Sequence, residues 1–198
     1  MRTFCLITLL LLAAPAAAAA QEATEVPELH TIRKVTLSPS YSCRSKEDFQ
    51  KGYQKTALFL PGAATGRNSP ALLFNGACGG ADYFDVNHAG ADMSVIADLG
   101  EGVELERLTA QDVFHGLRLP GSDGPQAMQF QIKAPVKWGH TYAVVINKGD
   151  FRGLLYFTVT GYIPNERLDL RYVVKHYEQL RIAAQSPGFD WTKRNSQR

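Results

Sequence analysis

The chain has 198 residues, of which 45% are hydrophobic and 20% are charged, and its 21 Lys and Arg residues nearly balance its 19 Asp and Glu residues. This length is enough to bury the core of one domain. The formal net charge of +2 excludes bulk electrostatic attraction to nucleic acid or to an anionic membrane surface.

Residues 1–20 have the three parts of a cleavable secretory signal peptide. Arg2 is the one charged residue, an uncharged apolar stretch follows, and small residues stand at Ala18 and Ala20. We expect cleavage after Ala20 and export of residues 21–198 to the periplasm or the cell exterior. The alternative is a retained membrane anchor, but the apolar stretch is short for a hydrocarbon core of about 30 Å. Without residues 1–20 the formal net charge falls from +2 to +1, and no later stretch is apolar enough to span a membrane.

The first half of the exported part predicts short strands separated by turns. Residues 21–29 have no periodic pattern and are expected to form an extended leader, and the β-branched residues of the segment 30–37 favour a first strand. Ser45 with Asp48 three positions later is typical of a helix N-terminus, and Gly52 limits that helix to a short one. Further short strands are expected over residues 56–60, 71–74, 82–87, 93–99 and 103–108, with a loop over residues 61–70.

The second half shows clearer alternation of apolar and polar residues. Residues 126–132 place Met128, Phe130 and Ile132 on one face of an expected strand. The segments 141–146 and 154–160 flank a turn that contains Gly149, which predicts a hairpin. Residues 168–176 fit a strand or a helix, and the pair Val173-Val174 favours the strand.

Eight to ten short strands with little helix predict an all-β fold, an antiparallel sandwich of the jelly-roll kind. No internal repeat interrupts the chain after the signal peptide, so we expect one domain over residues 30–185 and a polar tail over residues 186–198, in which Phe189 and Trp191 can dock on the body.

Two cysteines remain after removal of the signal peptide, Cys43 and Cys78. An even pair in an oxidising compartment predicts a disulfide, which would stabilise the fold by roughly 3–4 kcal/mol. The alternative is two buried free thiols.

Two segments carry a family resemblance: DYFDV at residues 82–86, followed by Gly90 and by MSVIADLG at residues 93–100, and GHTYAVVI at residues 139–146, followed by residues 154–161. Together they resemble the opening strands and the closing hairpin of bacterial pre-peptidase C-terminal domains. The resemblance covers residues 81–161. It implies a small secreted β-sandwich that serves as a non-catalytic accessory to exported enzymes.

A polar cluster near residue 85 is a candidate calcium site, because hard oxygen ligands lie close together in a glycine-flanked stretch. The alternative is ordinary turn chemistry, and the EF-hand spacing is absent. The candidate ligands are Asp82, Asp85, Asn87 and Asp92, with His88 among them.

Asp112 and His115 are candidate catalytic residues, because they lie three positions apart with Ser122 and Asp123 nearby. No Gly-x-Ser-x-Gly motif accompanies them, and no pair of histidines or cysteines has zinc-ligand spacing. Glu104 and Glu106 lie on an expected strand and would share one face, which favours a solvated surface over a glycosidase pair.

Aromatic side chains are candidates for a flat binding platform, and Trp138 in a turn is the one expected to be exposed. Tyr83 and Tyr142 are the further candidates. From these patterns we expect a non-catalytic binding or accessory module for a protein or a glycan at the cell envelope, with no nucleic-acid partner and no resident cofactor other than calcium. The alternative is a small exported hydrolase whose site is assembled from distant residues.

Overall fold

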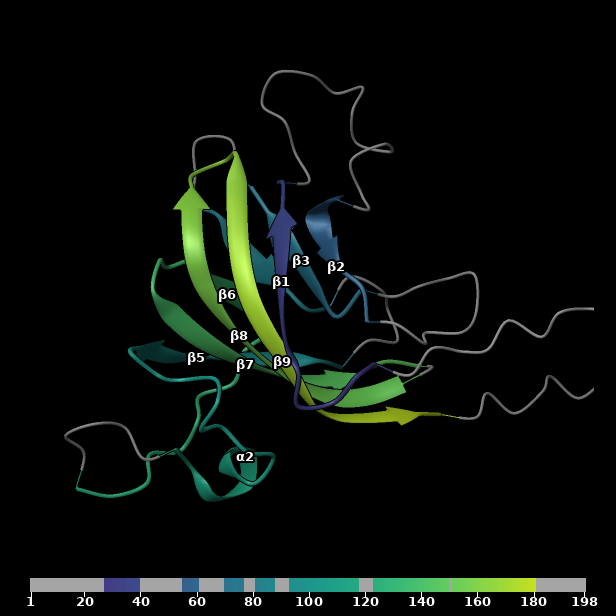
Figure 1. The fold of residues 1–198 in the computed structure, drawn as a ribbon, viewed down its shortest axis with the longest axis vertical. Helices are drawn as coiled ribbons and strands as arrows, with labels where there is room; N and C mark the ends of the chain where they lie inside the picture. Colours follow the sequence, from purple (N-terminus) through teal and green to yellow (C-terminus); the bar gives the residue numbers. More distant parts are fainter. Residues whose placement is uncertain are drawn as a thin grey trace, which may run out of the picture.

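The computed structural model of the chain describes residues 27–39, 55–60, 70–76, 81–87, 93–117, 123–149 and 151–180. These residues form nine strands and one short helix, arranged in two antiparallel sheets (Figure 1). The all-β fold expected from the sequence is therefore confirmed.

The larger sheet, which we call sheet A, has five strands in the order β1-β9-β8-β7-β5. Its strands are β1 (Ile32–Leu37), β9 (Arg167–Gln179), β8 (Phe151–Ile163), β7 (His140–Asn147) and β5 (Val95–Glu101). The hairpin expected on either side of Gly149 is confirmed as β7 and β8, and the segment 168–176 is a strand within β9, as the pair Val173-Val174 favours. The helical alternative for that segment is wrong.

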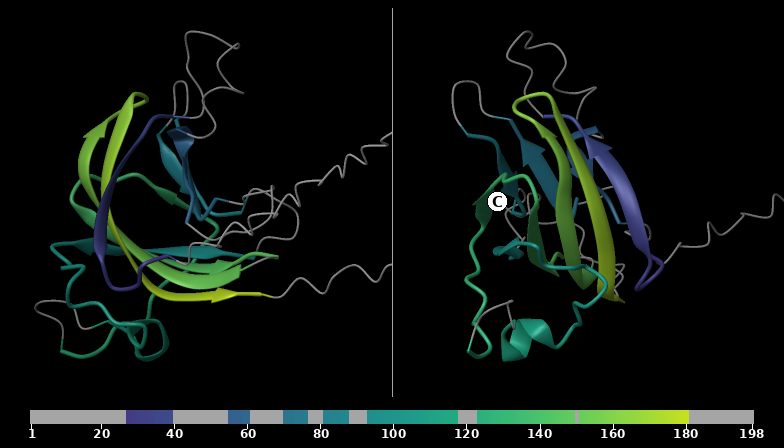
Figure 2. Two further views of the ribbon diagram at one scale, coloured as in Figure 1. Left: turned by 45° about the vertical axis from the view of Figure 1, so that its right-hand side comes forward. Right: turned by 60° about the vertical axis from the view of Figure 1, so that its left-hand side comes forward.

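The smaller sheet, which we call sheet B, has four short strands in the order β2-β3-β4-β6. They are β2 (Ala57–Leu58), β3 (Leu72–Asn75), β4 (Tyr83–Asp85) and β6 (Lys133–Pro135). Figure 2 shows sheet B facing the concave side of sheet A.

The two sheets are joined by backbone hydrogen bonds along both sides. At one side, the Ser38 N–H just after β1 donates to the Lys55 carbonyl just before β2, at 2.9 Å. At the other side, Gln131 just before β6 exchanges two hydrogen bonds with Ile96 of β5, at 2.7 and 2.9 Å. Residues at the outer strands of the two sheets are therefore hydrogen-bonded to one another, so fewer backbone N–H and C=O groups of these strands are left unpaired.

The main core lies between the sheets. Alternate residues of the strands point inward, and large aromatic rings fill the centre. Phe84 of β4 packs edge-on against Tyr142 of β7 and Phe157 of β8, with ring centroids 5.1 and 4.9 Å apart, and the last two stack at 5.0 Å. All three side chains are completely buried.

A second hydrophobic cluster covers the opposite face of sheet A. The described residues of the connection between β5 and β6, 102–117 and 123–132, cross this face and include α2 (Asp112–His115) (Figures 1 and 2). Leu105 and Leu108 of this connection are buried against Ala143 and Tyr156 of the sheet. The Tyr156 hydroxyl donates to the Thr109 carbonyl at 3.0 Å, which fastens the connection to the sheet.

Two expected strands are absent from this connection. Residues 103–108 form turns, so Glu104 and Glu106 do not share a strand face; Glu104 pairs with Arg107 and Glu106 with Arg171. Of residues 126–132, only Gln126 and Gln131 make isolated bridges, while Met128 and Phe130 still pack on the second cluster and Ile132 is exposed. Alternation predicted the inward position of Met128 and Phe130 but not that of Ile132, and residues 126–132 belong to no strand of either sheet.

Several expectations fall outside the described residues: the signal peptide, the helix at residues 45–48, both cysteines and the tail from residue 186. Of the leader, only residues 27–29 are described. Among the described helical residues, none belongs to a helix with the length and apolar character needed to cross a membrane.

Candidate functional site

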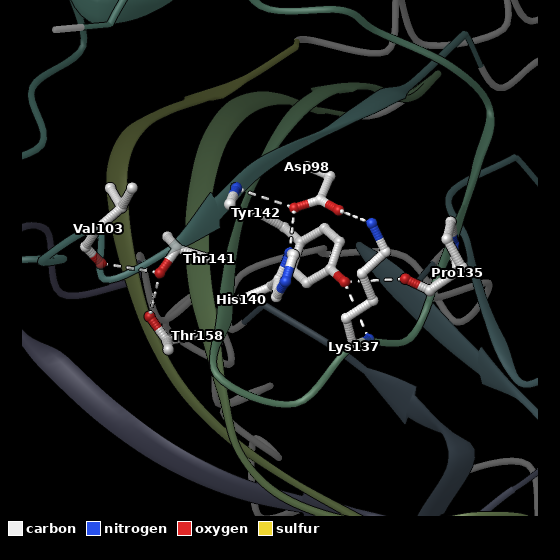
Figure 3. A network of polar contacts seen from close by, with 9 residues as sticks. Asp98, Val103, Pro135, Lys137, His140, Thr141, Tyr142 and Thr158 are labelled. Atoms are coloured by element: carbon white, nitrogen blue, oxygen red, sulfur yellow. Dashed lines mark hydrogen bonds and ion pairs between the residues drawn. The ribbon is translucent and has the colours of Figure 1, made fainter. Parts of the chain in front are cut away.

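The turn between β6 and β7, residues 136–139, which we call the Trp138 turn, is held in place by its surroundings. The Tyr142 hydroxyl accepts a hydrogen bond from the Lys137 N–H at 3.1 Å and donates one to the Pro135 carbonyl at 2.8 Å (Figure 3). The Gly139 N–H donates to the carbonyl of Val159 in β8 at 3.0 Å. Gly139 has a φ of 78°, a left-handed conformation that favours glycine at this position.

The Asp98 carboxylate fixes the side chains around this turn. A register shift in β5 between Asp98 and Gly100 directs that carboxylate toward the start of β7. Its Oδ2 lies 2.9 Å from the Lys137 ammonium, and its Oδ1 lies 2.8 Å from His140 Nδ1 and accepts a hydrogen bond from the Gly100 N–H at 2.9 Å (Figure 3). Because an ionised carboxylate only accepts, the Nδ1 of His140 is the donor.

The protonation of Asp98 follows from these contacts. Burial by itself would raise the pKa of the Asp98 carboxyl, but hydrogen bonds from His140, Lys137 and the Gly100 N–H outweigh burial and lower it below its ordinary value. The carboxylate is thus ionised at neutral pH. The Asp98 and His140 side chains are 19% and 23% exposed, so this is a partly shielded network at the surface.

Trp138 projects from this fixed turn into solvent, with 64% of its surface exposed. The exposure expected for Trp138 is therefore confirmed. The exposed Glu101 side chain lies beside the same turn, since a β-carbon added to Gly139 would be 3.4 Å from Glu101 Oε1. The Trp138 turn thus has the Glu101 carboxylate beside Gly139 and the ammonium of Lys137, the residue before Trp138, a combination that can bind both apolar and polar parts of a ligand.

The remaining hydroxyls at this end of sheet A are engaged in the fold. The Thr141 hydroxyl donates to the Val103 carbonyl at 2.8 Å and lies 2.8 Å from the Thr158 hydroxyl (Figure 3). Asp98 orients His140 as an acidic residue orients the base in a serine hydrolase. In the described part of the chain, no hydroxyl or thiol hydrogen-bonds to His140.

The expected pair of Asp112 and His115 is not brought together. Asp112 Oδ2 turns back to accept hydrogen bonds from the N–H and the hydroxyl of Thr109, at 2.6 and 3.0 Å. His115 is exposed at the end of α2, a helix of one turn, and no hydrogen bond joins it to Asp112. Ser122 lies outside the described residues. Within the described residues, the Asp–His pair joined by a hydrogen bond is Asp98 and His140.

The described candidate calcium ligands make hydrogen bonds within the fold. Asp82 is buried, and its Oδ2 accepts hydrogen bonds from the Tyr162 hydroxyl at 2.9 Å and from the Asn165 N–H at 2.7 Å. Asp85 instead accepts from the Asn87 N–H at 3.0 Å, an Asx turn, and Asn87 Oδ1 accepts from the Ser94 N–H at 2.8 Å.

No cluster of three or more His, Cys, Asp or Glu that could hold a metal ion occurs among the residues described. His88 and Asp92 lie outside them. The described candidates therefore act in turns and anchoring contacts of the fold.

The other two expected platform residues lie elsewhere. Tyr142 is completely buried under the Trp138 turn, so its expected place on a binding surface is wrong; alternation put it on the inner face of β7. Tyr83 is half-buried on sheet B, with the Lys133 ammonium 4.9 Å from its ring centroid.

A second feature is a cavity of about 490 Å³ on the outer face of sheet A. It opens between α2 and the ends of β7, β8 and β9 that lie nearest the β7–β8 turn. Its lining is mainly apolar, with Val145 and Leu154 on the sheet side and Val113 and Phe114 on the α2 side.

Comparison with known proteins adds no functional assignment: the chain matches no protein-family model, no curated protein and no solved structure. The class that fold and site define is an all-β, two-sheet protein with a rigid exposed tryptophan turn and an open apolar cavity.

Proposed function

We propose that this protein is an exported, non-catalytic binding module of the cell envelope that recognises a glycan through the Trp138 turn. The observation that carries the proposal is an indole that is 64% exposed on a turn held by the Tyr142 hydroxyl and by a backbone hydrogen bond from Gly139 to Val159. Tryptophan is enriched at binding interfaces, where its apolar ring and its polar N–H both find partners.

Rigidity is the first argument for binding. A loop that is already ordered loses little conformational entropy when a ligand binds, so more of the contact free energy appears as affinity. The Tyr142 hydroxyl and the Asp98 carboxylate order the Trp138 turn without any ligand. Tryptophan is also the residue type enriched where binding energy concentrates.

The groups around Trp138 favour a glycan over a protein partner. The apolar C–H face of a sugar ring stacks on an indole, while its hydroxyls need nearby donors and acceptors. The Lys137 ammonium and the Glu101 carboxylate supply both kinds of group beside the turn. A protein partner remains an outcome of the test below.

The test is binding of the purified chain to an array of envelope glycans. We expect Trp138→Ala to weaken binding by more than about tenfold, because a central aromatic anchor contributes on the order of 2 kcal/mol. Trp138→Phe should retain part of the affinity, and Ile163→Ala, which shortens another exposed apolar side chain, should change nothing.

Unchanged glycan binding by Trp138→Ala would contradict the proposed surface. A protein captured by the wild type but not by Trp138→Ala would replace the glycan with a protein partner. Turnover of ester, glycoside or peptide substrates that is lost in His140→Gln would overturn the non-catalytic assignment and support the hydrolase alternative.

Export also predicts the disulfide between Cys43 and Cys78. One contact in the described residues supports it: a β-carbon added to Gly76 would lie 2.5 Å from the Cβ of Pro39. The chain therefore passes close to itself two residues before Cys78 and four residues before Cys43, within the reach of both segments. Alkylation of the unfolded protein before reduction should leave both cysteines unmodified.

A further inference from the structure

The cavity of about 490 Å³ lies at the opposite end of β7 from the Trp138 turn. That turn precedes His140, the first residue of β7, whereas the cavity is lined by the last three residues of the strand, 145–147. The connection over residues 102–132 covers the outer face of sheet A only in part, and the cavity is where that cover ends.

The walls of the cavity suit an apolar group of small-molecule size. Ala110, Val113 and Phe114 line one side, and Val145 and Leu154 line the other. Its volume lies within the range of about 300–1,000 Å³ that is typical of small-molecule sites. Phe114 is 80% exposed, so in the absence of a ligand a large apolar surface at this cavity faces water.

The rim of the cavity carries two opposite charges that do not neutralise each other. Arg152 of β8 and Glu178 of β9 are register partners, and both line the cavity. Neither side chain forms a hydrogen bond or an ion pair within the described part of the chain, although cross-strand neighbours of opposite charge commonly do. Both remain available to a ligand with a positive and a negative group.

We propose that this cavity binds a single-chain amphiphile with a zwitterionic head group, the chemistry of a lysophospholipid. The alkyl chain lies against Val145, Leu154 and Phe114. The anionic group of the head pairs with Arg152, and its cationic group pairs with Glu178. The open side of the cavity leaves the head group in contact with water, so its charges are not fully desolvated. This site is independent of the glycan-binding surface.

The experiment compares amphiphiles that share one alkyl chain and differ in head charge. Dodecylphosphocholine is zwitterionic, dodecanoate is anionic and dodecyltrimethylammonium is cationic. Each is titrated into the purified chain by calorimetry below its critical micelle concentration. We expect dodecylphosphocholine to bind most tightly, by about two- to fivefold over each singly charged probe, because it alone carries an anionic group for Arg152 and a cationic group for Glu178, and each exposed ion pair contributes up to about 1 kcal/mol.

Single substitutions test which side chain contacts each part of the amphiphile. Arg152→Gln and Glu178→Gln should each weaken dodecylphosphocholine binding by about two- to fivefold, and Phe114→Ala should weaken all of the probes alike. All three side chains are exposed, so the folds should survive, which circular dichroism checks. Trp138→Ala is the matched control, and it should leave amphiphile binding unchanged even if glycan binding fails.

The proposal is overturned if none of the probes binds, or if dodecylphosphocholine binds but neither charge variant affects it. Tighter binding of dodecanoate in Glu178→Gln than in the wild type, with dodecylphosphocholine no better than dodecanoate, would also overturn it in favour of an anionic ligand. Because glycan binding is measured separately with Trp138→Ala, failure here is distinct from failure of the glycan proposal.

Discussion

At the scale of residues, the carboxylate of Asp98 connects three separate pieces of backbone. It accepts from the Gly100 N–H in its own strand, from the Lys137 side chain in the Trp138 turn and from His140 at the start of β7. The carboxylate thus links the Lys137 side chain of the Trp138 turn and the His140 side chain to β5.

The ionised form of Asp98 makes the stability of the fold pH-dependent. The pKa of the Asp98 carboxyl is lowered in the folded protein. The ionised carboxylate therefore stabilises the fold fully at pH values above its ordinary pKa of 3.8. This stabilisation is lost as the pH falls through the lowered pKa of the folded protein. We expect Asp98→Asn to reduce the free energy of unfolding at neutral pH by about 1–2 kcal/mol, because an amide is a weaker acceptor from Lys137 and His140.

Urea denaturation at a series of pH values measures this effect. The difference between the wild type and Asp98→Asn should shrink as the pH falls below 3.8. Asp123→Asn, which changes an exposed carboxylate outside the network, should show no such pH-dependent difference. A constant difference at all pH values would mean that packing, rather than charge, accounts for the loss.

The sequence did not reveal the Asp98–His140 pair. The two residues are 42 positions apart, and they meet because β5 pairs with β7 and because the register shifts after Asp98. Neither the choice of partner strand nor a bulge can be predicted from alternation alone. Asp112 and His115 were proposed as catalytic residues because they are close in sequence. In the structure, Asp112 begins a helix of one turn, and its carboxylate accepts a hydrogen bond from the Thr109 N–H rather than from His115.

At the scale of elements, regular strands were the most predictable part. Each described strand of sheet A overlaps a segment expected from alternation or β-branched content, because these strands bury one or both faces between two hydrophobic clusters. The errors fell in the 102–132 connection. An irregular segment that covers a sheet also needs apolar residues at intervals, so Leu105 and Met128 gave a strand-like pattern without strand partners.

The Trp138 turn depends on a left-handed glycine, which gives a matched pair of variants. Gly139 and Gly102 both have a φ of 78°, and only Gly139 belongs to the Trp138 turn. Alanine in this conformation costs about 1 kcal/mol, so both Gly139→Ala and Gly102→Ala should lower the thermal midpoint by a similar amount.

Binding distinguishes the two glycine variants. Only Gly139→Ala should also weaken glycan binding, because it shifts the backbone that carries Trp138 and brings a β-carbon to 3.4 Å from Glu101 Oε1. Equal glycan affinities in the two variants would show that the conformation of this turn does not control recognition.

At the scale of the whole molecule, sheet A is shared by both hydrophobic clusters. Leu155 of β8 is buried in the cluster between the sheets, and Leu105 is buried in the cluster on the outer face. Because the same strands support both clusters, we expect the described parts of the molecule to unfold as one cooperative unit.

Two core variants test this cooperativity. Leu155→Ala and Leu105→Ala should each destabilise the protein by about 2–5 kcal/mol, the usual loss for a buried leucine. In calorimetry, each variant should show one transition shifted to lower temperature. A separate early transition in Leu105→Ala alone would mean that the 102–132 connection unfolds independently of the sheets.

The position of β9 between β1 and β8 has a consequence for how the chain reaches this structure. Ile32 of the first strand pairs with Val173 of the last, so β1 has no partner in sheet A until β9 has been synthesised and has added to β8. Pairing β1 with β9 closes a long loop of chain, which costs conformational entropy. The contacts of β1 offset this cost only when most of the strand has paired with β9. The hairpin of β7 and β8 can form early from local contacts, whereas the N-terminal strand must wait, which makes its docking on β9 a natural rate-limiting step of folding.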